Sequence, residues 1–193
     1  MSLAGIIAGA VLAGVGAYLI YRSVGNRNQR STESRQDPKN VRASITINRS
    51  ASELYHYWRH LSNLSDVMSH LESVTEKTDT RSHWVVKGPL GTDVEWDAEI
   101  TQDRENQLIA WRSAKEAEVQ NEGSVTFTQA PGGRGTEVRV SLTYHPPGGP
   151  LGEAVAKLFG EEPSQQLSDD LRRFKQRMET GVTATTQGQP SGN

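Results

Sequence analysis

The stretch from residue 81 to 113 constrains the fold most, because apolar and polar residues alternate through three successive segments. In the middle segment, residues 93–100, every second side chain is apolar and those between are acidic. This period of two is typical of an antiparallel strand with one buried face. Residues 81–87 and 109–112 continue the pattern, and residues 88–91 (GPLG) have the composition of a turn. We therefore predict three adjacent antiparallel strands.

The faces of neighbouring strands must match, and this fixes the register of the predicted sheet. Trp84 then lies opposite Trp96, and Trp111 points to the same side from the third strand. These three indoles either fill a core or wall a ligand cavity, since apolar pockets are built from such side chains. On the opposite face the register predicts four charged neighbours: Arg81–Glu99, His83–Asp97, Lys87–Asp93 and Arg112–Asp97.

The remaining segments complete an α+β pattern. Residues 41–47 alternate as a strand, Ser50 to Glu53 form a capping box that predicts a helix, and residues 64–71 predict a second, short helix. Strands are predicted at 73–78, 124–128 and 137–144, and a kinked amphipathic helix at 151–178. The sheet and the last helix each have one apolar side, so we expect them to bury these sides against each other and leave a hollow between them.

Charge and composition exclude several functions. The chain has no cysteine, so disulfides and thiolate sites are excluded. Residues 1–42 hold six Lys/Arg against two Asp/Glu, whereas the rest hold fifteen against twenty-one, which argues against nucleic acid as a partner. His56 and His60 have a zinc-compatible spacing without a third ligand, and the glycine-rich residues 130–135 precede a strand rather than a phosphate-binding helix. We expect no metal and no cofactor.

The N-terminal segment is typical of a membrane anchor. Leu3 to Tyr21 carries no charge over nineteen residues, long enough for about 28 Å of helix. Positive residues follow it and none precedes it, which predicts a single-pass cell-membrane protein with a cytoplasmic globular part. Gly5 and Gly9 form a GxxxG pair on which a homodimer could form. The predicted organisation is a transmembrane helix (1–21), a disordered basic linker (22–40), a folded domain (41–179) and a disordered tail (180–193).

Five stretches of the folded part carry a resemblance to a known family: WRHLSNLSDVMSHLESV, SHWVVKGPLGTDVEWDAEI, IAWRS, GGRGTEVRV and GEEPSQQLSDDLRRFK. They resemble the polyketide cyclase/dehydrase branch of the START-like (SRPBCC, Bet v 1-type) superfamily, and a membrane-anchored bacterial subgroup within it. The resemblance covers residues 41–179. It implies a helix-grip fold, a curved antiparallel sheet wrapped on a long C-terminal helix, with a cavity for lipids, quinones such as coenzyme Q, or polyketides. The superfamily has no universal catalytic motif, so no catalytic residue is carried over.

Three functions remain open at this point. The first is a membrane-tethered module that binds a hydrophobic small molecule. The second is a protein-interaction scaffold with a vestigial cavity and an acidic outer sheet. The third is a cyclase/dehydrase-type enzyme, for which Tyr144 is the one clear polar candidate; we lean against an enzyme. The residues predicted to line a ligand site are Trp84, Trp96, Trp111, Phe127, Tyr144, Leu167 and Leu171.

Overall fold

The computed structural model describes residues 37–87, 93–117, 119–145 and 163–181. In chain order the helices and strands of these residues are β1 (Lys39–Ile47), α2 (Ala51–Arg59), the 3-10 turn η1 (Leu61–Asp66), β2 (Leu71–Glu76), β3 (Arg81–Val86), β4 (Val94–Arg104), β5 (Leu108–Ser113), β6 (Gln120–Gln129), the short turn η3 (Pro131–Gly133), β7 (Thr136–His145) and α4 (Pro163–Thr180).

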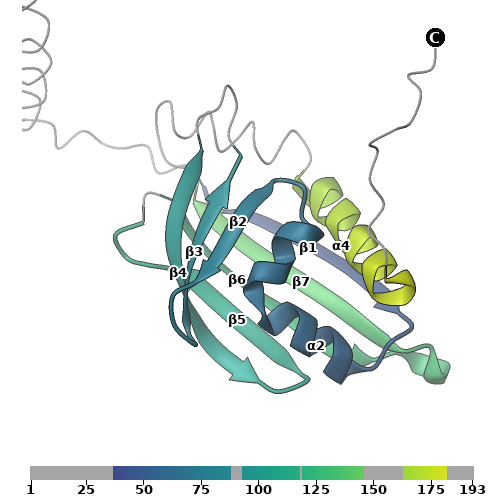
Figure 1. The fold of residues 1–193 in the computed structure, drawn as a ribbon. Helices are drawn as coiled ribbons and strands as arrows, with labels where there is room; N and C mark the ends of the chain where they lie inside the picture. The colour runs from purple at the N-terminus through teal and green to yellow at the C-terminus, as the bar shows by residue number, and fades with distance from the viewer. Residues whose placement is uncertain (1–36, 88–92, 118, 146–162, 182–193) are drawn as a thin grey trace, which may run out of the picture. The chain divides into compact units, whose positions relative to one another are not determined.

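The strands form one curled antiparallel sheet in the order β1-β7-β6-β5-β4-β3-β2. The first strand of the chain closes against the last, and the strands between them follow as hairpins. Helices α2 and α4 lie over the same inner face of the sheet (Figure 1). The predicted arrangement, a curved antiparallel sheet with a C-terminal helix packed on it, is confirmed and corresponds to a helix-grip fold.

The predicted register of the central strands is confirmed. Trp84 pairs with Trp96, and on the outer face His83 pairs with Asp97. The prediction for Arg112 was wrong by one pair: it lies opposite Glu99, with Nη2 2.6 Å from Oε1. Arg81 lies opposite Glu99, as predicted. Lys87 interacts electrostatically with Asp93, the predicted neighbour, but its ion pair is with Glu72 on the neighbouring strand β2.

Helix α2 begins at the predicted capping box. The Ser50 side chain accepts a hydrogen bond from the Glu53 backbone N–H, and the Glu53 carboxylate accepts one from Ser50 N–H. The second helix is a correction: η1 ends at Asp66, and Leu71 already starts β2. The reason is that Leu61 and Leu64 bury at a spacing of three, which suits a 3-10 turn, while Leu71 packs as the first inward residue of a strand.

The core lies between the sheet and the helices. It contains the inward residues of the strands together with Leu54 and Trp58 of α2 and Leu171 and Phe174 of α4. Helix α4 begins with Pro163, where the missing N–H is tolerated in the first turn. The predicted start of this helix at residue 151 and its kink lie outside the described residues.

No helix among the described ranges is long and apolar enough to cross a membrane. The predicted membrane segment (3–21), most of the basic linker (22–40), the Gly5/Gly9 pair and nearly all of the predicted tail (180–193) lie outside these ranges. These predictions therefore stay predictions.

Candidate functional site

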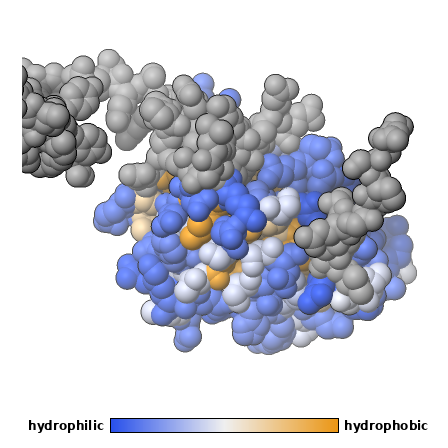
Figure 2. Space-filling view, turned by 45° about the horizontal axis from the view of Figure 1, so that its top comes forward, coloured by the Kyte–Doolittle hydropathy of each residue, from blue (hydrophilic) through white to orange (hydrophobic). Residues whose placement is uncertain are grey.

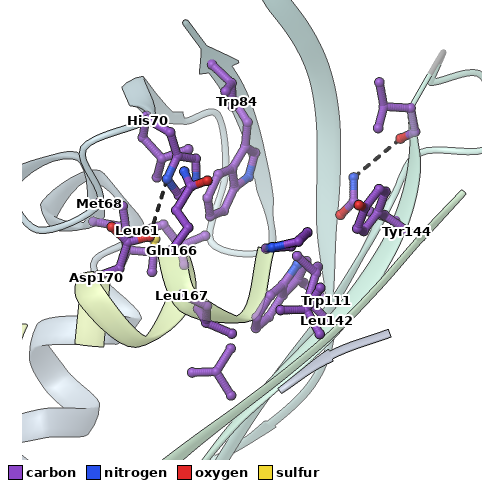
Figure 3. Close-up of a pocket in the computed structure, with 18 of the residues that line it drawn as sticks. Leu61, Met68, His70, Trp84, Trp111, Leu142, Tyr144, Gln166, Leu167 and Asp170 are labelled. Carbon is purple, nitrogen blue, oxygen red and sulfur yellow. Dashed lines mark hydrogen bonds and ion pairs between the residues drawn. The ribbon is translucent and has the colours of Figure 1, made fainter. Parts of the chain in front are cut away.

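An apolar cavity of about 100 Å³ lies between the inner face of the sheet and the start of α4. The strands contribute Trp84, Trp96, Trp111, Leu142 and Tyr144, the segment from η1 to β2 contributes Leu61, Leu64, Met68, His70 and Leu71, and α4 contributes Pro163, Gln166, Leu167 and Asp170. Figure 3 shows side chains from α4 and from both halves of the sheet converging on this space. On the face drawn in Figure 2, a few hydrophobic residues are visible between hydrophilic ones.

Two stacked indoles form one aromatic wall. The rings of Trp84 and Trp96 are nearly parallel, with centroids 6.2 Å apart and an interplanar angle of 8°. The Trp84 Nε1–H donates a 2.9 Å hydrogen bond to Oγ of the buried Ser82. Because this polar atom is satisfied within the protein, the rest of the Trp84 ring acts as apolar surface toward the cavity.

Trp111 reaches the cavity because its strand neighbour is a glycine. Gly123 pairs with Trp111 across β5 and β6. A Cβ atom at Gly123 would lie 2.5 Å from Cζ2 of the indole and 2.9 Å from the Ser141 carbonyl oxygen. Both distances are too short for carbon, so only glycine leaves the indole room in its present position.

The structure separates the seven predicted site residues into two groups. Five of them line the cavity: Trp84, Trp96, Trp111, Tyr144 and Leu167. The other two, Phe127 and Leu171, are buried in the hydrophobic core and are not cavity walls. The ring of Phe127 instead meets the rings of Tyr55 and Trp58 edge to face. Ligand binding by any of the seven stays a prediction.

Several residues that line the cavity were not predicted from the sequence. Trp58, one of the buried residues of α2, also borders the cavity, so all four tryptophans of the chain line it. Gln166 and Asp170 of the last helix also border the cavity, although neither is apolar. Their spacing of three from Pro163 and from Leu167 places them on one stripe of α4, and this was the signal that could have found them.

Most of the described cavity walls are apolar, and the polar side chains among them are His70, Asn121, Tyr144, Gln166 and Asp170. Burial raises the pKa of the Tyr144 hydroxyl, so the group stays protonated at neutral pH and can donate a hydrogen bond but is a poor base. His70 Nδ1 lies 3.3 Å from Oδ2 of the buried Asp170. Among the described residues, no group of three or more His, Asp and Glu side chains is placed to hold a metal ion.

Known proteins with similar sequences and structures place this chain in a family. The family of polyketide cyclase/dehydrase and lipid transport proteins matches residues 47–172. An uncharacterised 17.2 kDa protein of Streptomyces lincolnensis is 29% identical over 142 residues, which cover 72% of this chain and 89% of that protein.

Two solved structures are informative. A crystal structure of a Deinococcus radiodurans protein is 45% identical with a TM-score of 0.61, over 75% of this chain and 100% of that one. An aromatase/cyclase from a Streptomyces species is 14% identical with a TM-score of 0.53, over 76% of this chain and 99% of that one, and at this identity it shows the fold alone. The predicted resemblance to the polyketide cyclase/dehydrase branch is confirmed, and the fold is the one that START-like domains share: this chain belongs to the polyketide cyclase/dehydrase and lipid transport family.

Proposed function

We propose that this domain binds a hydrophobic small molecule in the cavity between the sheet and α4. One observation carries the proposal: all four tryptophans of the chain, from α2, β3, β4 and β5, line one cavity. Large aromatic side chains bury the most apolar area when they pack tightly, so a space left among four of them is a costly feature for a structural core. Binding sites for apolar molecules are built in this way.

The volume narrows the kind of molecule. Pockets for drug-sized ligands have about 300–1,000 Å³, whereas this cavity has about 100 Å³. A space of this size suits a single ring or a short section of an acyl chain. We propose a molecule whose ring or chain end enters the cavity, such as a quinone or a lipid, while a longer remainder requires the walls to move.

A cavity-filling variant tests this function in the full chain extracted in detergent. We expect Leu142→Trp to block the cavity, because Leu142 is one of its walls on β7. The matched control is Thr143→Trp, since the adjacent Thr143 side chain points to the outer face. A benzoquinone with a short isoprenoid tail should quench the indole fluorescence saturably in the parent protein and the control. Purely collisional quenching in the parent protein would contradict the proposal.

The small volume also favours the second candidate, a scaffold with a vestigial cavity. Its proposed docking surface, the acidic row of β4, is however largely neutralised. Asp97 pairs with Lys77 and His83, each with a nitrogen 2.8 Å from Oδ1, and Glu99 pairs with Arg112. A binding partner retained by the parent protein and lost with Asp97→Lys would favour this candidate over a ligand-binding role.

We further propose that residues 3–21 anchor the domain in the cell membrane, with the domain on the cytoplasmic side. The support is the uncharged run and the positive residues that follow it. Such a tether would keep the cavity close to a source of apolar molecules. Deletion of residues 1–36 should move the protein from the membrane fraction to the soluble fraction of a cell lysate. Unchanged fractionation would contradict the anchor without touching the cavity.

A further inference from the structure

Two neighbouring glutamines of α4 have different surroundings. Gln165 is exposed, and its Nε2 donates a 3.2 Å hydrogen bond to Oδ1 of Asp169, one turn further along the helix. Gln166 is only partly exposed and borders the cavity. Figure 3 shows its side chain extending from α4 among the other side chains that line this space. One amide therefore belongs to the solvent side of the helix and the other to the apolar cavity.

The acidic residue one turn after Gln166 does not engage its amide. This residue is Asp170, whose side chain is 1% exposed. Its Oδ1 pairs with the Arg173 guanidinium, which also donates a 3.0 Å hydrogen bond to the Val67 carbonyl, and its Oδ2 lies 3.3 Å from Nδ1 of His70. Within the residues that the structure describes, the side-chain amide of Gln166 has no hydrogen-bond partner. Its donors and its acceptor are thus available to a bound molecule.

An amide beside apolar walls needs a partner once water is displaced. A molecule that fills the cavity removes the water that such an amide otherwise binds, and a polar group left without a hydrogen bond weakens binding. An oxygen atom of the ligand next to Gln166 avoids this loss, whereas a hydrocarbon does not. Because the amide carries two N–H donors, rotation of the group presents a donor to a ligand carbonyl.

The charges of the cavity walls also restrict the ligand. The walls that the structure describes include no lysine and no arginine. Arg173 is not among them, and its guanidinium is engaged by Asp170. A carboxylate or phosphate group would therefore give up its hydration without a permanent positive charge to replace it. A neutral oxygen atom meets the Gln166 amide without this cost.

We propose that the Gln166 amide selects a neutral ligand whose ring or chain end bears a carbonyl group, and that it donates a hydrogen bond to this carbonyl oxygen. The ligand class is thus a quinone, ketone or ester rather than a hydrocarbon or a carboxylate anion. This inference rests on the proposed binding function and names the chemical group by which the cavity distinguishes its ligand.

Acetophenone and α-methylstyrene are matched probes, because they differ only in an oxygen atom in place of a methylene group. Both have the one-ring size that small apolar cavities bind. The full chain is reconstituted in lipid nanodiscs with ¹⁵N-labelled tryptophan and glutamine side chains, and protein-free nanodiscs correct for partitioning. The Trp84 indole signal reports occupancy, and the Gln166 amide signal reports the hydrogen bond.

We expect acetophenone to bind about fivefold more tightly than α-methylstyrene, the effect of one hydrogen bond. Acetophenone should also shift the Gln166 amide protons downfield, whereas α-methylstyrene, which has the same ring, should not. Gln166→Met should keep α-methylstyrene binding and bring acetophenone to within about twofold of it. Gln165→Met is the matched control, because Gln165 is exposed and is not a wall of the cavity, and it should keep the preference of the parent protein.

A preference for acetophenone that persists in Gln166→Met would overturn the proposal. If this variant does not fold, the amide signals of the parent protein still decide, and unmoved Gln166 amide protons at saturating acetophenone would overturn it. Benzoate is the charged probe and should bind at least about tenfold more weakly than acetophenone. Tighter binding of benzoate would overturn the neutral ligand class.

The two proposals fail in different ways. If neither acetophenone nor α-methylstyrene binds, the cavity does not take apolar molecules and the proposed function is wrong. If both bind equally to the parent protein, the proposed function stands and the role of Gln166 is wrong.

Discussion

The space beneath α4 differs between the two ends of the helix. At the C-terminal end, Leu171 and Phe174 are each 1% exposed and pack into the core. At the N-terminal end, Gln166 and Leu167 border the cavity. The change from cavity wall to core occurs within one turn of a single helix. We call these regions the packed end and the cavity end.

Aromatic rings occur at both ends, but they are arranged differently. At the packed end the rings of Trp58 and Phe174 meet edge to face, 5.3 Å apart at 84°. At the cavity end the rings of Trp84 and Trp96 are nearly parallel, with centroids 6.2 Å apart, and both rings border the cavity. Interlocked edges fill volume, whereas stacked rings present flat surfaces. We infer that the packed end carries most of the stability and the cavity end carries the binding.

The largest effect should follow truncation at the packed end. Phe174→Ala removes a ring that contacts both Tyr57 and Trp58. We expect a loss of about 3–5 kcal/mol in the free energy of unfolding, measured by urea denaturation, because the cavity left behind cannot collapse in a rigid core. A loss below about 1 kcal/mol would show that this end is not the packed one.

A second prediction concerns Gly135, which lies against the backbone of Ile47. Its φ is +89°, and a Cβ there would lie 2.1 Å from the Ile47 carbonyl oxygen. Gly135→Ala should therefore cost at least about 2 kcal/mol of stability, through both strain and the clash. Gly133→Ala is the control, since its φ is +68° with nothing within 4 Å, and it should cost about 1 kcal/mol. Equal losses of stability for Gly135→Ala and Gly133→Ala in thermal unfolding would show that the contact with the Ile47 carbonyl oxygen is not responsible.

A matching test at the cavity end substitutes Gly123, which lies against the Trp111 indole. Gly123→Ala should push Trp111 out of its position, with an overpacking cost of about 1–3 kcal/mol and weaker quinone quenching. The double variant Gly123→Ala/Trp111→Phe should recover part of the stability, because the smaller ring leaves room. If the stability losses of the two single variants simply add in denaturation experiments, the Trp111 indole is not the reason for a glycine at position 123.

Two leucines four residues apart compare the ends most directly. Leu167 is half-buried at the cavity, whereas Leu171 is buried in the core. We expect Leu167→Ala to cost about 1 kcal/mol, and to alter quinone binding by enlarging the cavity. Leu171→Ala should cost about 2–5 kcal/mol and leave the cavity unchanged. The reverse order of stabilities would contradict the division of the helix.

The sheet could be predicted from the sequence, because strand alternation and face matching are local rules. They set Trp84 opposite Trp96 and His83 opposite Asp97, as the structure confirms. The segment that contains Leu64 and Leu71 could not be assigned in this way. A few apolar residues at mixed spacing fit an α-helix, a 3-10 turn or a strand, and contacts with the sheet decide among them.

The periodicity of the sequence could not predict which apolar residues border the cavity and which lie in the core. Leu167 and Leu171 belong to the same apolar stripe, and nothing local says that only the first borders a hollow. That depends on how the volumes of side chains distant in sequence add up. Asp170 was missed for a related reason. An acidic residue in a helix is expected to be exposed to solvent, and its burial follows only from contacts with residues far away in the chain, such as His70.

The smallest effect should come from the outer face, which belongs to neither end. Hydrogen bonds from Lys77 and then from His83 lower the pKa of Asp97 below its ordinary value of 3.8. Since the pKa in the folded state is the lower one, the stabilisation is present above that ordinary value and is lost as the pH falls through the folded value. Asp97→Asn should therefore cost about 0.5 kcal/mol or less near neutral pH, because the pair is half exposed, and the difference from the parent protein should shrink below about pH 4. Urea denaturation across that pH range measures it, and a difference that persists in acid would assign the effect to something other than the charge of Asp97. Quinone binding should be unaffected, because this side chain lies on the far side of the sheet from both the packed end and the cavity end.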